Sequence, residues 1–457
     1  MKGMVQGWGD RDKLMYSALN SALNSALNSA LNSTLNTAGS SATCVGLTLA
    51  LWISTPLTAA TLAQSITAAP DGTGTQISVT GSQISIGGGS QRGNNLFHSF
   101  TDFGLDAQQT AIFEGNPSLA NILGRVSGGQ VSVIDGLIQV SNSQAHLYLM
   151  NPAGLIFGPN ARLDLAGPFT ATTATALGFD RGWWPAQGSA ATDSLVGSPN
   201  RFAFVGSQPG AIVNAGDLAV VPGAALTLLG GTVVNTGHLR APGGAITLMA
   251  VPGESLVRVQ QQGMILGLDL EPLSGSSTDA LVLSPFPSTI LDLPQLLTGG
   301  HLGHATHLEV TPTGTVRLSS TAPSSSPDRV PDRPGATTVI AGTLDVSSPH
   351  SSAPGGESGG TLQVLGQEVG VGDRAQLRAD GAGGGGRILV GGDYQGQGSV
   401  PSAHHTTIRP GAQISANALT QGNGGQVIIW ADNQTEFGGS IAAIGGVLGG
   451  NGGFVEV

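Results

Sequence analysis

Carboxylates are the side chains of this sequence best suited to catalysis, because a pair of Asp or Glu residues can act as general acid and general base. The chain has 457 residues, of which 28 are Asp or Glu. They follow no common spacing, so we expect no catalytic pair among them; the residues considered are Asp164, Asp217, Asp269, Asp345 and Asp393. We therefore keep enzymatic activity only as the alternative to a non-catalytic function, and we assign no catalytic residue.

Two glycine-rich motifs match nucleophile or cofactor patterns only in form. GESGG, residues 356–360, fits the nucleophile elbow but lies in a Gly/Ser loop with no helix after it. GAGGGG, residues 381–386, fits a dinucleotide fingerprint because nearly every residue is Gly. We expect neither an acyl-transfer site nor a cofactor.

Histidines occur in two clusters that could bind a metal. His301, His304 and His307 recur every third residue, which suits one face of a helix better than a strand, and His404 and His405 are adjacent. We interpret both clusters as exposed loop histidines and expect no metal site.

The overall composition excludes several classes of protein. Charged residues make up only 10%, Gly supplies 72 positions, and the formal net charge is −11. No lysine follows Lys13, so the chain lacks the basic stripe that binds phosphate backbones. We expect no nucleic-acid partner, and the aliphatic, aromatic-poor composition favours thin layers of β-structure.

The first 63 residues have the pattern of a low-complexity leader and a signal peptide. A four-residue Ser-Ala-Leu-Asn repeat occupies residues 17–36, and residues 44–54 form an apolar run too short to span a bilayer. Thr61 and Ala63 at the −3 and −1 positions favour cleavage before Gln64, and Ala60 is the alternative cleavage position. The only cysteine, Cys44, belongs to this leader, so the exported chain has no disulfide.

An internal repeat of about twenty residues explains the abundance of Gly and Asn. Residues 210–229 and 231–249 align, with Asn214 matching Asn235 and Leu218 matching Leu239 at a spacing of 21. A period near twenty, with short alternating strands between Gly and Asn turns, is typical of a β-solenoid. We expect Asn214 and Asn235 to form a hydrogen-bonded ladder between neighbouring coils.

A second pattern, Gly-Gly-x-apolar-x-apolar, recurs along the chain. Two apolar side chains pointing inward and a tight turn at the glycines fit one strand of a coil. Buried aliphatic side chains at about 1.5–3 kcal/mol each cannot order a single coil by themselves, so its stability must come from stacking. The six instances begin at Gly128, Gly243, Gly359, Gly385, Gly424 and Gly452.

Three segments interrupt the repeat. Residues 180–209 contain Trp183 and Trp184 and are predicted to leave the solenoid, while residues 320–336 form a Pro/Ser loop between two blocks of coils and residues 352–360 form a further loop.

Two Asn-Pro segments predict tight turns. In Asn151-Pro152-Ala153-Gly154 the proline fixes φ, the glycine accepts a positive φ, and Leu155 re-enters the core. A simpler copy lies upstream, at Asn116, Pro117, Ser118 and Leu119.

The segments NNLFHSFTDFGL, NPSLANILGRVSGG and LYLMNPAGLIFGPNARLDL resemble the secretion domain of filamentous haemagglutinin-like exoproteins, the two-partner secretion family of Gram-negative bacteria. The family's two signature turns map onto Asn116–Leu119 and Asn151–Leu155. Ser118 and Ala153 stand where the family has a second Asn, and Leu155 replaces Ile. The resemblance covers residues 64–310, and the Gly-rich residues 359–457 are similar to the repeats of cyanobacterial-type members.

The resemblance implies an all-β, right-handed parallel β-helix with an N-terminal cap and extra-helical loops. It also implies export by the signal peptide and passage through an outer-membrane β-barrel transporter, whose periplasmic modules recognise the secretion domain. Folding then takes place outside the cell. The secretion-motif residues would be Asn116, Pro117, Leu119, Asn151, Pro152, Gly154 and Leu155.

The sequence thus predicts four parts: a leader (1–63), a secretion domain (64–310), an interruption with one coil (311–358) and Gly-rich coils (359–457). We expect a non-catalytic adhesin-like or matrix exoprotein, outside the cell or on its surface, whose receptor belongs to a host, a neighbouring cell or a polysaccharide. The alternatives are a carbohydrate-active β-helix enzyme and a truncated secretion-domain remnant.

Overall fold

The computed structural model divides into two compact units, residues 1–60 and 61–457. The first unit, with most of the expected leader, lies outside the described residues, and so do His301 and His304. In the part of the chain that is described, no helix is long and apolar enough to cross a membrane. The structure describes residues 65–188, 192–262, 265–273, 307–310, 316–319, 336–348 and 356–457.

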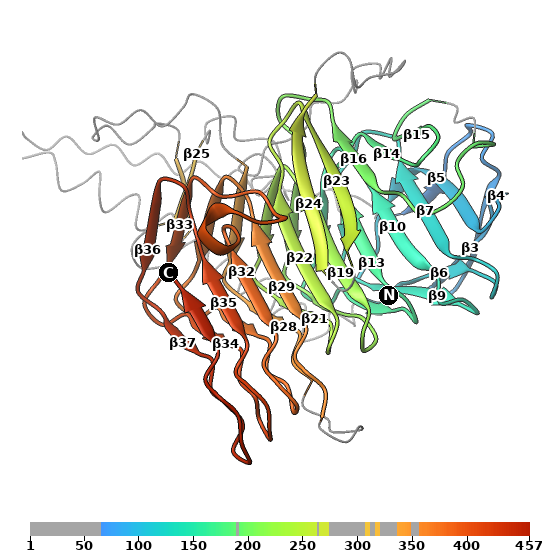
Figure 1. Ribbon diagram of the computed structural model, residues 1–457. Coiled ribbons are helices and arrows are strands. Elements are labelled where there is room, and N and C mark those ends of the chain that lie inside the picture. The colour runs from blue at the N-terminus through green and yellow to red at the C-terminus, as the bar shows by residue number, and fades with distance from the viewer. Residues whose placement is uncertain are drawn as a thin grey trace, which may run out of the picture. The chain divides into compact units, whose positions relative to one another are not determined.

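Three sheets made of short, mostly parallel strands form the second unit, and each complete coil contributes one strand to each sheet (Figure 1). Sheet A contains β1 (Ile66–Ala68), β4 (Ser90–Arg92), β5 (Asn95–Phe103), β7 (Asn121–Val126), β10 (His146–Met150), β13 (Phe169–Thr172), β19 (Ala225–Gly230), β22 (Ala245–Ala250), β29 (Thr361–Leu365), β32 (Arg387–Val390), β35 (Gln426–Ile429) and β38 (Phe454–Glu456). Sheet C contains β8 (Ser132–Ile134), β11 (Leu155–Phe157), β17 (Ala211–Asn214), β20 (Thr232–Asn235), β27 (Thr337–Ile340), β30 (Glu368–Val371), β33 (His405–Ile408) and β36 (Gln434–Phe437).

Sheet B closes each coil. It contains β2 (Thr75–Thr80), β3 (Gln83–Gly88), β6 (Thr110–Glu114), β9 (Leu137–Ser141), β12 (Arg162–Asp164), β18 (Asp217–Ala219), β21 (His238–Arg240), β28 (Thr343–Asp345), β31 (Gln376–Arg378), β34 (Gln413–Ser415) and β37 (Ser440–Ala442). The predicted all-β parallel β-helix is confirmed.

An N-terminal cap is built from the antiparallel pairs at the start of this unit. β1 and β4 pair with β5 in sheet A, and β2 pairs with β3 in sheet B. These antiparallel strands cover the first parallel strands of the stack, as expected, and β2 is then the outermost strand of sheet B.

Extra-helical segments leave the stack where sheet A leads to sheet C. The first forms β14 (Ala176–Gly178), β15 (Trp183–Pro185) and β16 (Arg201–Phe204), and the second forms β23 (Ser255–Gln262) and β24 (Ile265–Pro272). Together they make one antiparallel sheet, in the order β15-β14-β16-β23-β24. β25 (His307–Val310) and β26 (Val316–Ser319) pair separately, and a 3-10 turn, η1 (Tyr394–Gly396), lies in a later excursion.

The coils continue in one stack across the long interruption between residues 251 and 335. β22 pairs in parallel with β29, β20 with β27 and β21 with β28, so Arg240 faces Asp345. The blocks before and after the Pro/Ser loop are therefore consecutive in space, although the loop separates them in sequence.

Aliphatic side chains fill the inside of the coils, and a second cluster lies between sheet A and the extra-helical sheet. Ile122, Leu147, Phe169 and Leu226 belong to the first cluster, while Trp184 belongs to the second. Five of the six Gly-Gly-x motifs lead into sheet A; the one at Gly128 leads into β8 of sheet C instead.

Close stacking of the coils requires glycine where sheet A strands begin. A Cβ on Gly386 would overlap the Gly360 carbonyl oxygen, and one on Gly425 would overlap that of Gly386. The Gly-Gly motif therefore serves the contact between coils as well as the turn.

Candidate functional site

The turn at Asn151 connects β10 to β11 and is buried. The Asn151 side-chain Oδ1 accepts a hydrogen bond from Ala153 N at 3.0 Å, and Gly154 N donates to Asn151 O at 3.1 Å. Asn151 Nδ2 donates to Gln130 O and to Ser132 Oγ, both at 2.9 Å. Because Gln130 and Ser132 belong to the preceding coil, this amide joins two coils as well as closing its own turn.

The residues after Asn151 complete the turn. Gly154 has a φ of 126°, which residues other than glycine rarely adopt, and Leu155 is fully buried. The Pro152 carbonyl oxygen is so close to Gly210 of the next coil that a Cβ there would overlap it.

The upstream turn at Asn116 connects β6 to β7 and faces solvent. Asn116 Oδ1 accepts hydrogen bonds from Ser118 N at 3.0 Å and from Ser118 Oγ at 2.5 Å. Leu119 N donates to Asn116 O at 3.2 Å, and Leu119 is buried while Pro117 is exposed. The two signature turns therefore lie at different corners of the coil and differ in burial.

Asn214 and Asn235 lie opposite each other in sheet C, and Asn214 Nδ2 donates to Asn235 Oδ1 at 2.7 Å. Both side chains are fully buried, and each also bonds the backbone two residues ahead. Phe157 precedes Asn214 in this column and Ile340 follows Asn235, so the ladder consists of these two asparagines.

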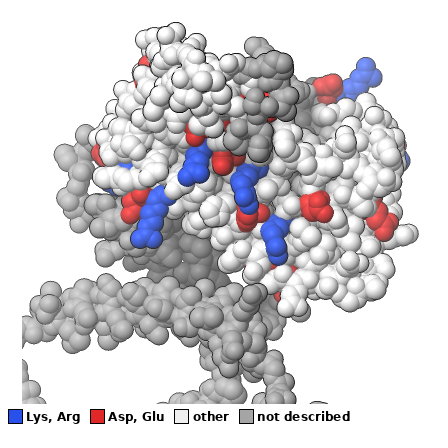
Figure 2. Space-filling model, turned by 90° about the horizontal axis from the view of Figure 1, so that it is seen from below, with Lys and Arg blue, Asp and Glu red and all other residues white. Residues whose placement is uncertain are grey.

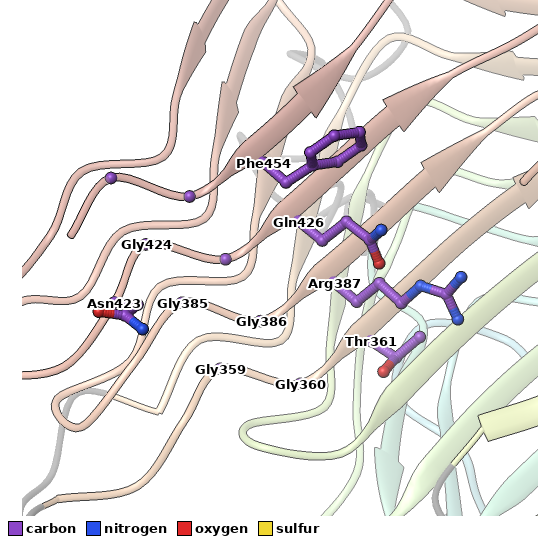
Figure 3. A pocket seen from close by; sticks show the side chains of 13 residues that line it. Gly359, Gly360, Thr361, Gly385, Gly386, Arg387, Asn423, Gly424, Gln426 and Phe454 are labelled. Atoms are coloured by element: carbon purple, nitrogen blue, oxygen red, sulfur yellow. The ribbon is translucent and has the colours of Figure 1, made fainter. Parts of the chain in front are cut away.

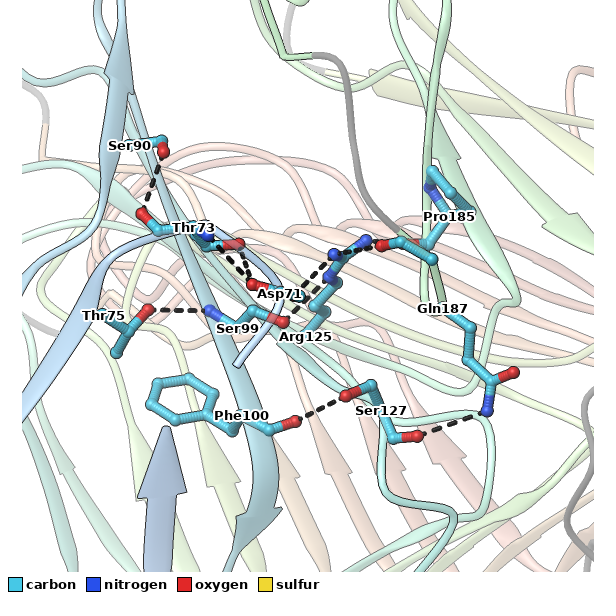
Figure 4. A network of polar contacts seen from close by, with 11 residues as sticks. Asp71, Thr73, Thr75, Ser90, Ser99, Phe100, Arg125, Ser127, Pro185 and Gln187 are labelled. Carbon is cyan, nitrogen blue, oxygen red and sulfur yellow. Dashed lines mark hydrogen bonds and ion pairs between the residues drawn. The ribbon is translucent and has the colours of Figure 1, made fainter. Parts of the chain in front are cut away.

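A buried arginine, which sequence reasoning missed, connects the cap, the coils and the extra-helical sheet (Figure 4). Arg125 on β7 is fully buried, and its guanidinium lies 2.7 Å from Asp71 Oδ2 in the cap. It also donates to Ser99 Oγ at 3.0 Å, Pro185 O at 2.5 Å and Gly188 O at 2.6 Å. Its Cζ lies 5.2 Å from the centre of the Trp184 ring.

These contacts satisfy a charge that would otherwise be costly to bury. Burial alone would raise the pKa of Asp71, but hydrogen bonds from Ser99, Thr73 and Arg125 outweigh it and lower that pKa to about 2. The ion pair therefore persists through ordinary pH. The sequence signal that could have found it is one arginine within a strand of otherwise buried residues, Asn121–Val126.

A comparison with protein families decides the identity of this region. The model of the TPS secretion domain matches residues 63–281. The chain carries a TPS secretion domain. This confirms the resemblance to the two-partner secretion family, and the domain implies export and a partner transporter in the outer membrane.

Solved structures and curated proteins add little to this assignment. The HMW1 secretion domain from Haemophilus influenzae is 20% identical, with 86% of this chain and 92% of that chain covered and a TM-score of 0.41. A filamentous hemagglutinin secretion domain is 11% identical, with 86% and 100% covered and a TM-score of 0.35. No curated protein matches. Because both TM-scores are below 0.5, we infer the fold from the strand ladders alone.

The acids considered for catalysis do not form one cluster, either in the TPS secretion domain or in the later coils. Asp217 and Asp345 both lie on the outer face of sheet B, but Arg240 lies between them. Arg240 Nε donates to Asp217 Oδ1 at 3.1 Å, and Arg240 also faces Asp345, which in turn faces Arg378. Figure 2 shows basic and acidic side chains side by side on one face. Each of these carboxylates therefore has a cationic neighbour.

The remaining acids and the histidines form no metal site in the described ranges, where no group of three or more His, Cys, Asp or Glu side chains could hold an ion. Asp393 pairs with Arg387 at 2.5 Å, and His405 Nδ1 lies 2.9 Å from Glu368 Oε1. Asp164 Oδ2 accepts from Gln139 Nε2 at 2.6 Å.

A shallow groove of about 780 Å³ crosses four coils after the TPS secretion domain (Figure 3). Its floor is the row of glycine pairs that precede β29, β32, β35 and β38. One column of side chains follows those glycines: Thr361, Arg387, Gln426 and Phe454 face one another in register. The groove therefore presents backbone groups and mostly neutral side chains.

Proposed function

We propose that the protein is a non-catalytic exoprotein that acts outside the cell or on its surface as an adhesin-like or matrix protein. The observation that carries this proposal is the TPS secretion domain, whose coils continue without a break in the ladder into residues 336–457. A continuous stack gives a long, repetitive surface, which suits adhesion better than it suits a catalytic centre. A host, a neighbouring cell or a polysaccharide would supply the receptor.

The groove, whose one charged lining residue is Arg387, supports the adhesive role. Thr361, Asn423 and Gln426 offer hydroxyl and amide groups beside the glycine backbone of the groove. Such groups hydrogen-bond well to uncharged polar ligands. The interleaving of Asp217 and Asp345 with Arg240 argues against the hydrolase alternative, which needs a pair of acidic side chains flanking the scissile bond.

We further propose that the Asn-Pro turns act in export through folding. Asn151 closes its turn and ties it to the preceding coil, so a chain emerging from the transporter would add this coil only once the turn has formed. The exposed turn at Asn116 is the better candidate for direct contact with the transporter's periplasmic modules. In this proposal residues 1–63 are removed, 64–310 direct export, 311–358 supply one coil together with its loops, and 359–457 extend the stack.

Deletion of the partner transporter tests export and adhesion separately. Cells with and without the transporter gene would be compared for the protein in medium, on the surface and in the periplasm. We expect loss of the first two pools and a degraded periplasmic pool. Unchanged export would contradict two-partner secretion. Normal export with no binding of wild-type cells to host cells, neighbouring cells or polysaccharide would contradict only the adhesive role.

A further inference from the structure

One strand of the cap has an unprotected edge. β2 is the last strand of sheet B and pairs only with β3 among the described strands. No charged residue and no proline occur between Asp71 and Arg92, and Val79 is 65% exposed. Soluble proteins usually protect such edges with charge, proline or a bulge, because a bare edge pairs with another strand.

The hydrogen-bond pattern of the cap shows which residues point outward. In an antiparallel pair, bonded residues alternate along each strand. Gly89 N donates to Gly74 O, so the even-numbered residues of β2 bond to β3. On the other side of β3, Thr110 N donates to the carbonyl oxygen of Ser82, which immediately precedes β3. The free backbone N–H and C=O groups of β2 therefore belong to Thr75, Ile77 and Val79.

We propose that β2 mediates contact between two copies of this chain. It pairs antiparallel with β2 of the second copy, about a two-fold axis at Ser78. In this register Ile77 of one copy faces Val79 of the other, and both residues present free backbone groups to each other. Four backbone hydrogen bonds form, and the two Ser78 residues face each other as a non-bonded pair.

A second copy fits this edge better than an unrelated ligand. Val79 lies on the same face of β2 as Ile77, which packs against the core, so pairing covers the exposed Val79 with the Ile77 of the other copy. The absence of charge on β2 means that two identical strands do not repel. A glycan has no matching row of amide donors and acceptors.

The contact is weak for one pair of molecules, because two six-residue strands bury far less than the roughly 1,200 Å² of a stable interface. Many copies on one surface would strengthen it through multivalency. The inference does not depend on the adhesive role, since it concerns contact between copies only.

Cysteine cross-linking tests the register directly. The full chain, exported by cells, would carry Cys44→Ser to exclude the leader's cysteine, together with Ser78→Cys. Facing residues of a non-bonded pair have Cα atoms about 4.5 Å apart, within the roughly 4.4–6.8 Å range of disulfides. The matched control is Gln76→Cys, whose two copies would lie about 14 Å apart.

We expect mild oxidation to give at least tenfold more disulfide-linked dimer for Ser78→Cys than for Gln76→Cys. Adding Val79→Pro should remove most of that dimer, because it deletes an outward donor while leaving the β2–β3 bonds intact. Equal dimer yields for the two cysteine variants, an unchanged yield with Val79→Pro, or capture of a different protein by the thiol of the Ser78→Cys chain would overturn the proposal.

Discussion

The Arg125 guanidinium lies 2.7 Å from the Asp71 carboxylate, although 54 residues separate them in sequence. Asp71 belongs to the cap, and the same guanidinium bonds the carbonyl groups of Pro185 and Gly188. One buried side chain therefore joins three parts of the TPS secretion domain that form at different points along the chain.

Replacement of Arg125 by Met should lower the free energy of unfolding by about 3–5 kcal/mol, because it removes the cationic partner of Asp71 and the donor to the carbonyl oxygens of Pro185 and Gly188. The matched control is Arg92→Met, whose exposed pair with Asp193 contributes about 0–1 kcal/mol. Urea titration of both variants measures the difference. A loss for Arg125→Met no larger than that for Arg92→Met would show that the buried cluster does not stabilise the domain.

Replacement of Asn151 by Ala should cost about 1–3 kcal/mol, since Ala153 N, Gln130 O and Ser132 Oγ lose a buried partner. Asn116→Ala, at the exposed turn, should cost less than about 1 kcal/mol. Secretion should fall in proportion to stability if the turns act through folding. Measuring exported and periplasmic protein for both variants decides this: a greater export defect in Asn116→Ala would assign recognition to that turn instead.

Two glycine positions test the close approach of the coils. Gly386→Ala should destabilise the stack by about 1–3 kcal/mol or more, because its Cβ would overlap the Gly360 carbonyl oxygen. Gly370→Ala has open space around its Cβ and should be neutral or stabilising by about 0.5 kcal/mol. Thermal unfolding of both variants provides the comparison, and equal effects would mean that the coils are not packed this closely.

Acid should destabilise the cap through His98. This residue is fully buried with neither ring nitrogen hydrogen-bonded, and burial lowers its pKa from 6.5 to about 4. The unfolded chain therefore binds the proton more tightly than the folded chain. Stability is complete above pH 6.5 and falls as the pH drops toward 4, by up to about 3 kcal/mol.

His98→Phe should flatten this part of the pH profile. Burial also lowers the pKa of His146, to about 3, so some dependence should persist in the variant. Urea midpoints measured from pH 7 to pH 4 test the effect. Equal slopes of the two pH profiles would mean that His98 does not cause the loss of stability in acid.

The sequence predicted local features well and distant contacts poorly. The spacing of 21 between Asn214 and Asn235 was enough to place them in register, because consecutive coils are neighbours in both sequence and space. The partners of Arg125 come from the cap and from an excursion, so no period relates them. Likewise, nothing in residues 251–335 indicates that β21 pairs with β28 on the far side of the interruption.

Expectations about the acids were incomplete for the same reason. No spacing in the sequence relates Asp217 to Asp345, yet the ladder places both on sheet B. Arg240, which bonds Asp217 and faces Asp345 in the ladder, is close to Asp217 in sequence but far from Asp345. Only the stacking of coils across the interruption brings these three residues together.

The most direct test of the account is a disulfide across the interruption. Arg240 and Asp345 face each other on neighbouring parallel strands, so Arg240→Cys with Asp345→Cys should have Cα atoms about 4.8 Å apart and should form an intramolecular disulfide in the Cys44→Ser chain. The control, Arg240→Cys with Arg378→Cys, is two strands apart and should stay reduced. Quantitative cross-linking in the first pair alone is the predicted result; reduced thiols in both pairs would contradict a single continuous stack.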